Sequence, residues 1–183
     1  MKKIVVSILV IVAVIIGCKT ANSNDVKKLA LNFEPKSNSS VAGTATFTEK
    51  KGKVTFEAKL TGLKPGVHAI HIHEKSDCSA ADGSSAGGHW NPTFKKHGKW
   101  GEGEYHKGDI GNFTADENGN GTITLTTEEW CIGCGDPAKD VLEKGYKKLN
   151  VQIHNNFIIA PQPLLRNDNY SNEVLKNSFL PKI

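Results

Sequence analysis

The chain has 183 residues, of which 38% are hydrophobic and 23% are charged, and its formal net charge is +4. This length suits one domain with a hydrophobic core, and the composition excludes a disordered or fibrous protein. The small net charge argues against nucleic acid as a partner, because nucleic-acid-binding domains carry a marked basic excess.

The first 17 residues predict a secretory signal peptide. Lys2 and Lys3 give a basic start, and residues 4–16 form a run that is apolar except for Ser7. This run is shorter than the roughly 20 residues that a membrane-spanning helix needs. Gly17-Cys18 resembles the end of a bacterial lipoprotein signal, so we expect Cys18 to be lipidated; an ordinary cleaved signal peptide is the alternative.

A lipidated Cys18 would make the mature protein an exported lipoprotein. It would be anchored to a membrane of the bacterial cell envelope, in the periplasm or at the cell surface. Residues 18–24 then form the lipidated N-terminus and a short polar tether. Removal of residues 1–17 takes away two lysines and no acidic residue, which lowers the formal charge to +2.

Residues 25–154 predict an all-β domain. Apolar and polar side chains alternate over residues 54–60, and residues 44–48 and 122–126 show a similar period of two. Turn residues separate these segments at 49–52, 64–66 and 117–121. Short strands joined by Gly and Pro turns, without a convincing amphipathic helix, favour an antiparallel barrel or sandwich.

Three histidines fall on a strand predicted over residues 67–74. Successive side chains of a strand point to opposite faces, so His71 and His73 share one face. These two imidazoles could bind a metal ion together. His68 shares the other face with Ile70 and Ile72, and we expect it to lie in the core with a hydrogen-bonded ring.

Further potential ligands follow in a segment rich in Gly, Ser, Asn and Pro: His89, His97, His106 and Asp109. A single histidine in a loop is usually solvated, but imidazole and carboxylate groups at this density predict a metal site. Imidazole suits copper and zinc, and three histidines with one aspartate suit a closed tetrahedral zinc site.

These segments resemble the successive motifs of the copper/zinc superoxide dismutases. The stretches that carry the resemblance are GVHAIHIHE (66–74), SAGGHWNP (85–92), KHG (96–98) and HKGDIGN (106–112). They follow the family's order and spacing over about residues 43–127. The resemblance implies an antiparallel Greek-key β-barrel or sandwich with long metal-binding loops, and an antioxidant oxidoreductase that converts superoxide to dioxygen and hydrogen peroxide.

The resemblance also assigns roles to single residues. It implies that His71, His73 and His89 bind copper, and that His89 bridges copper to zinc and acts as the catalytic residue that takes up a proton. His97, His106 and Asp109 are implied as the other zinc ligands, and His68 as a structural histidine.

The C-terminal third departs from the family's pattern. Leu149 stands where the fourth copper histidine is expected, and His154 follows five residues later in a segment that alternates apolar and polar residues. His154 is therefore a candidate copper ligand if the preceding loop absorbs five residues; a solvent-facing histidine is the alternative. Arg166 lacks the neighbours of the family's conducting arginine. Residues 155–183 do not resemble the C-terminal end of the family. This divergent tail could be a lineage-specific replacement or the product of a reading-frame change, and the last strand of the barrel is therefore uncertain.

The cysteines also differ from the family's pattern. Cys78 aligns with a disulfide cysteine of the family, but no cysteine follows Cys134 to serve as its usual partner. Cys131 and Cys134 are expected to pair with each other, or one of them with Cys78, because exported proteins favour disulfides. Their two-residue spacing also permits a redox or metal-binding role.

Three functions are compatible with the sequence: an active superoxide dismutase, a copper- and zinc-binding lipoprotein of the same fold with little or no activity, and a structural or adhesive lipoprotein. The complete set of six ligands argues against the third. A homodimer is compatible with the sequence, which does not set the oligomeric state.

Overall fold

The computed structural model describes residues 26–142, 150–153 and 158–159 of the chain. Residues 1–25, including Cys18, lie outside this part, as do His154 and Arg166. The described elements are β1 (Lys27–Pro35), β2 (Ala42–Lys50), β3 (Lys53–Thr61), β4 (Gly66–His73), a 3-10 helix (Ser84–Ala86), β5 (Asp109–Ala115), β6 (Gly121–Thr127), β7 (Asn150–Ile153) and β8 (Ile158–Ile159).

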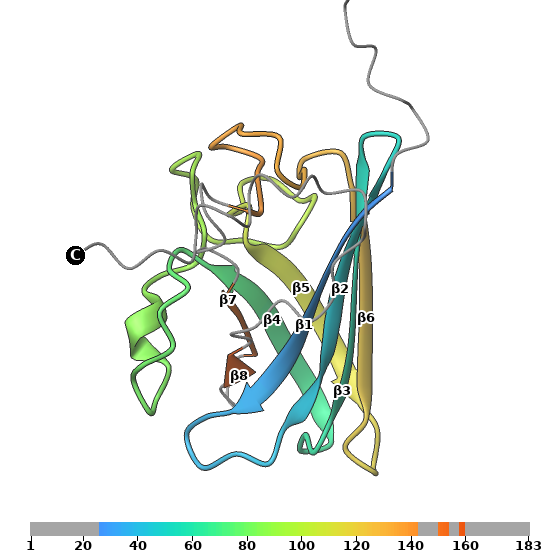
Figure 1. Cartoon of the computed structure of the whole chain (residues 1–183). Coiled ribbons are helices and arrows are strands. Elements are labelled where there is room, and N and C mark those ends of the chain that lie inside the picture. Colours follow the sequence, from blue (N-terminus) through green and yellow to red (C-terminus); the bar gives the residue numbers. More distant parts are fainter. Residues whose placement is uncertain (1–25, 143–149, 154–157, 160–183) are drawn as a thin grey trace, which may run out of the picture.

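The strands form one curled sheet in the order β7-β4-β5-β6-β3-β2-β1-β8, and all pairings are antiparallel (Figure 1). Strands β4, β5 and β6 are neighbours in sequence and in the sheet, and β7 returns to lie beside β4, which is a Greek key. The edge strands β7 and β8 also contact each other. The all-β antiparallel fold predicted from the sequence is therefore confirmed.

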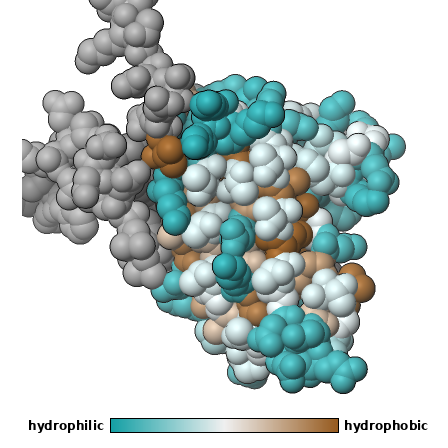
Figure 2. Space-filling view, turned by 90° about the vertical axis from the view of Figure 1, so that its right-hand side faces the viewer, coloured by the Kyte–Doolittle hydropathy of each residue, from teal (hydrophilic) through white to brown (hydrophobic). Residues whose placement is uncertain are grey.

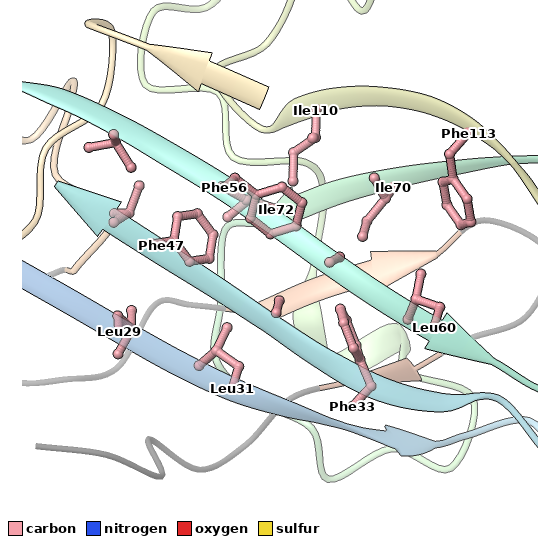
Figure 3. Packing of buried hydrophobic residues seen from close by; sticks show 14 of the residues in the cluster. Leu29, Leu31, Phe33, Phe47, Phe56, Leu60, Ile70, Ile72, Ile110 and Phe113 are labelled. Atoms are coloured by element: carbon pink, nitrogen blue, oxygen red, sulfur yellow. The ribbon is translucent and has the colours of Figure 1, made fainter. Parts of the chain in front are cut away.

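The core lies inside the curl of the sheet. Strands β1 to β5 direct their apolar residues inward, and Figure 3 shows side chains from all five strands, Phe33, Phe47, Phe56, Ile70 and Phe113 among them, on the same side of the sheet. Each of these residues is buried, because the alternation in every strand assigns its apolar positions to one face.

His68 lies in this core, as predicted. Its Nε2 is 2.7 Å from the carbonyl oxygen of Lys64, and its ring stacks on Phe113 with 5.7 Å between the centroids. The hydrogen bond satisfies one of the two ring nitrogens in an otherwise apolar environment. His68 thus has a structural position, on the face opposite to His71 and His73.

The outer face of β2, β3 and β6 carries mainly threonine, lysine and glutamate residues. Figure 2 shows a face of the molecule that is hydrophilic or intermediate in hydropathy over most of its area. Within the described residues, no helix has the length and apolar character that crossing a bilayer requires.

The strand ends differ from the predicted ones by a few residues, because turns rather than the alternation decide where pairing stops. A larger difference is β8, which falls within the tail from residue 155 onward, for which the sequence predicted no structure. Its two residues pair with Glu34 and Pro35 at the end of β1.

Candidate metal centre

The outward face of β4 carries the first two predicted ligands. His71 and His73 alternate with the core residues Ile70 and Ile72, so their rings point away from the core. Both rings are nevertheless buried, with 6% and 9% of their surface exposed. The long loop between β4 and β5 (Figure 1) carries His89, His97 and His106 and is hydrogen-bonded to β4 through the N–H of Trp90 and Ile72 O.

A β-bulge brings Asp109 to the same face. Strand β5 pairs Gly111 with Ile70 and then Asp109 with His71, so Ile110 is an extra residue opposite β4. If Ile110 paired regularly with His71, Asp109 would lie on the core face with Phe113 and Gly111. The bulge instead places the buried Ile110 in the core and Asp109 beside His71.

Backbone hydrogen bonds position the loop that carries His89. The N–H of Trp90 donates to Ile72 O (2.8 Å), and the N–H of Ile72 donates to Gly108 O (2.8 Å). A Cβ at position 108 would lie 2.3 Å from Ile72 O, so this close approach requires glycine. His89 therefore lies beside β4, in a bridge with His73.

Three imidazoles converge on the carboxylate of Asp109. The Nδ1 atoms of His89, His97 and His106 lie 2.9, 3.0 and 3.3 Å from its oxygens. His106 Nδ1 is buried and has no hydrogen-bond partner, although it faces the carboxylate. Three imidazole nitrogens gathered around one carboxylate form the donor set of a tetrahedral metal site.

Asp109 is held in its ionised form. Burial alone would raise the pKa of its carboxyl, but hydrogen bonds from the backbone N–H groups of His106 (2.9 Å) and Gly98 (3.1 Å), together with the His89 ring, hold the pKa below its usual range. The side chain is 2% exposed. A buried carboxylate surrounded by imidazoles supplies the negative charge that a divalent cation needs.

Neighbouring groups hold the rings of His71 and His73 in place. Burial, and then the neighbouring His89, lower the pKa of His71 to about 3, so its ring is neutral near pH 7. The ring of His71 stacks on that of His89 with 3.9 Å between the centroids. His73 Nδ1 lies 2.9 Å from Gly87 O, which fixes Nδ1 as the donor and leaves Nε2 to accept a metal.

A groove of about 670 Å³ lies beside these residues. Among the described residues, β5 and β6 pair only at Ala115 and Gly121 and then diverge. The groove is lined by residues of β5, β6 and the loop at 98–100, Trp100 and Leu125 among them, and it reaches His71 and His89. Solvent and small solutes therefore have access to the candidate centre.

Glu129 and Trp130, which the sequence did not identify as site residues, hold the segment around His106. Tyr105 Oη donates to Glu129 (2.6 Å), and Lys107 Nζ forms an ion pair with the other oxygen of Glu129. Trp130 Nε1 donates to Lys107 O (2.9 Å). His106 is thus fixed from both sides. Contacts between residues so far apart in sequence leave no periodic signal, so only the structure reveals them.

The structure brings together all six predicted ligands within its described part. Ligand atoms of His71, His89, His97 and Asp109 lie within 4.8 Å of one another, His106 joins them through Asp109, and the ring of His73 lies 5.1 Å from that of His89. His154, the seventh candidate, lies outside the described residues.

The disulfide in the structure joins Cys131 to Cys134. Cys78 is not part of it, so the alternative in which Cys78 pairs with one of these two cysteines is wrong for this structure. Cys131 and Cys134 lie in one short loop after β6, which keeps their side chains close together.

Comparison with known proteins agrees with this geometry. The family model for copper/zinc superoxide dismutase matches residues 41–154. A curated relative, the Cu-Zn superoxide dismutase 2 of Brassica juncea, is 39% identical over 92 residues, which are 49% of this chain and 59% of the relative. The matched part therefore spans less than two thirds of that relative. The crystal structure of the clock protein EA4 matches with a TM-score of 0.56 and 30% identity, over 74% of this chain and 78% of the other.

Proposed function

Because the chain belongs to the copper/zinc superoxide dismutase family, whose cofactors are copper and zinc, we propose that it disproportionates superoxide to dioxygen and hydrogen peroxide. The observation that carries the proposal is the convergence of three imidazole Nδ1 atoms on the buried Asp109, beside the stacked rings of His71 and His89. This arrangement offers one closed site and one adjoining site that share His89.

The closed site suits zinc. His89, His97, His106 and Asp109 supply three imidazole nitrogens and one carboxylate oxygen, the donor set of a tetrahedral zinc site. The backbone N–H groups of Gly98 and His106 already orient the carboxylate, so little reorganisation is needed on binding.

The adjoining site suits copper, with His71, His73 and His89 as ligands. Copper, when bound, supplies the one-electron oxidation and reduction of superoxide. His89 faces Asp109 through Nδ1, which leaves Nε2 for the copper side. We assign to this Nε2 atom the uptake and release of a proton on the way to hydrogen peroxide.

The register of β7 supports His154 as the fourth copper ligand. Asn150 and Gln152 pair with His73 and His71, so the even-numbered positions of this strand belong to the face that carries the two histidines. Residue 154 is the next even-numbered position in the sequence. His154 itself lies outside the described residues, and its assignment therefore depends on the experiment below.

A second candidate function is metal binding with little or no turnover. The described residues supply three imidazoles for copper, where the family uses four. In addition, Arg166 is the only arginine of the sequence and lies in the divergent tail, away from the matched motifs. Loss of a cationic guide would slow the capture of superoxide by roughly 10- to 1,000-fold.

We also propose that the protein acts outside the cytoplasm, anchored by a lipid on Cys18. The apolar run of residues 4–16 followed by Gly17-Cys18 supports this localisation. Metabolic labelling with a fatty acid would test it: wild type should incorporate the label and Cys18→Ser should not, whereas labelling of both would exclude this anchor.

Metal analysis together with an activity assay tests the proposed enzyme. The chain without residues 1–18 is loaded with copper and zinc, and superoxide consumption is measured on the same sample. One copper and one zinc per chain with rapid turnover is expected. His154→Ala should lose copper alone, and His97→Ala should lose zinc first. Zinc binding without turnover in the wild type would favour the second candidate.

A further inference from the structure

The loop after β6 holds a group of potential ligands that the proposed dismutase does not use. Cys131 and Cys134 form a disulfide there, and the carboxylate of Asp140 lies beside them, with one ligand atom from each residue within 4.8 Å of the others. We propose that reduction of this disulfide creates a second metal site, in which two thiolates and one carboxylate bind a zinc ion. The site is separate from the six ligands described above.

The backbone holds Asp140 next to the cysteines whether or not the disulfide is present. The N–H of Cys131 donates to Lys139 O (2.9 Å), and the N–H of Val141 donates to Cys131 O (3.0 Å). These two hydrogen bonds pair Cys131 with Asp140 in a parallel bridge. Since neither bond involves a sulfur atom, the three ligands should remain together after reduction.

The turn between the cysteines is also preformed. Gly133 and Gly135 have φ values of 66° and 77°, a region that favours glycine. Their N–H groups donate to the two oxygens of Asp140, at 2.8 and 2.7 Å. The segment therefore closes into a compact loop around one carboxylate, as a chelating site requires.

Both Asp140 and Cys134 have the capacity to bind a cation. Asp140 Oδ2 accepts one hydrogen bond, whereas a carboxylate has about four acceptor positions, so a lone pair remains for a metal. The N–H of Asp136 donates to Cys134 Sγ (3.5 Å), and such a hydrogen bond favours the thiolate over the thiol.

The exposure of the two sulfurs differs in a way that permits reduction. Cys134 is exposed, whereas Cys131 is 8% exposed. The thiolate of a dithiol reductant can attack Cys134 Sγ, which forms a mixed disulfide and releases Cys131 as a thiolate. The second thiol of the reductant then displaces Cys134 and becomes oxidised to a disulfide. Zinc binding would displace the protons that remain on the two cysteines.

The donor set selects zinc among the thiol-binding metals. Two thiolates and a carboxylate oxygen leave a fourth position for water, which suits tetrahedral Zn²⁺. Copper(I) prefers soft ligands only, and the carboxylate is a hard one. Cobalt(II) replaces zinc in such sites and shows a thiolate-to-cobalt charge-transfer absorption, which histidine and carboxylate ligands do not produce.

The experiment titrates cobalt(II) into the full-length protein before and after reduction by a dithiol that is then removed. We expect the reduced protein to bind one more cobalt ion per chain than the oxidised protein, with charge-transfer absorption in the reduced form only. Cys134→Ser should abolish the additional ion. Cys18→Ser and Cys78→Ser, as matched controls, should retain it, and Asp140→Asn should weaken it about 10-fold or more.

The outcomes separate this site from the proposed dismutase. Absence of the charge-transfer absorption in the reduced wild type would overturn the proposal, and so would an absorption that survives Cys134→Ser or disappears in Cys78→Ser. Superoxide consumption measured on the oxidised protein does not depend on this result, so the two proposals can fail independently.

Discussion

Replacement of Trp130 by phenylalanine tests whether the loop after β6 supports the zinc site. Trp130 is 1% exposed, and its Nε1 donates to Lys107 O next to His106. Phenylalanine keeps an aromatic ring in the core but cannot donate this hydrogen bond. The change leaves a carbonyl oxygen without its partner and removes part of a large, buried side chain.

The expected cost follows from these two losses. An unsatisfied carbonyl costs about 1–3 kcal/mol, and the reduced packing adds about 1 kcal/mol. The free energy of unfolding should therefore fall by about 2–4 kcal/mol, or by roughly 4–16 °C in Tm for a chain of this size. Because residues 105–107 become less well held, zinc affinity should also fall about 10-fold.

Competition with a chromophoric chelator measures the zinc affinity, and thermal unfolding of the metal-free protein measures the stability. Leu60→Ala is the matched control, since Leu60 is 2% exposed in β3 and its truncation costs about 2–5 kcal/mol. The control should lose stability but keep its zinc affinity. An affinity of Trp130→Phe within two-fold of the wild type, or an equal loss in Leu60→Ala, would refute the reasoning.

Three further predictions concern the same region. The hydrogen bond to Glu129 raises the pKa of Tyr105 to about 12, so the stabilisation that this bond gives is complete below about pH 10 and is lost as the pH rises through 12. In Glu129→Gln, a titration followed by tyrosinate absorbance should show the pKa of Tyr105 returning toward 10. An unchanged pKa of Tyr105 in this variant would contradict the contact. Gly108→Ala should lower the free energy of unfolding, measured by urea denaturation, by about 1–3 kcal/mol, because the added methyl group would meet Ile72 O. Gly88→Ala is the control and should be neutral, because its methyl group would meet nothing within 4 Å. Equal effects of the two substitutions would argue against a close approach at Gly108. His89→Ala should impair the binding of both metals in metal analysis, since this residue belongs to both proposed sites, and retention of normal copper binding would exclude a shared ligand.

Much of the fold and of the candidate centre could be predicted from local patterns. The alternation in β2, β3 and β6 identified these strands, and the spacing of His71 and His73 assigned them to one face of β4. The density of imidazoles up to Asp109 indicated a metal site. Each of these inferences needs only the period of a strand and the donor chemistry of the side chains.

Other features depend on contacts between distant segments and could not be read from the sequence. The bulge at Ile110 does not alter the apolar or polar character of any residue, so the alternation does not reveal it. The contacts of Glu129 and Trp130 with residues 105–107 join the loop after β6 to the loop before β5. The pairing of Cys131 with Cys134 depends on the conformation of one turn, for which the sequence left two solutions open.

The bulge at Ile110 makes the length of the chain as important as its composition at this point. Deletion of Ile110 would remove the extra residue and a buried side chain from the core. Insertion of one residue between Asp109 and Gly111 would keep every ligand in the sequence but move Asp109 away from its position opposite His71. Residues 101–104, which are exposed, carry no such constraint. Insertions and deletions in homologous proteins should therefore accumulate in that exposed segment and avoid the first residues of β5, and engineered loops should be introduced there.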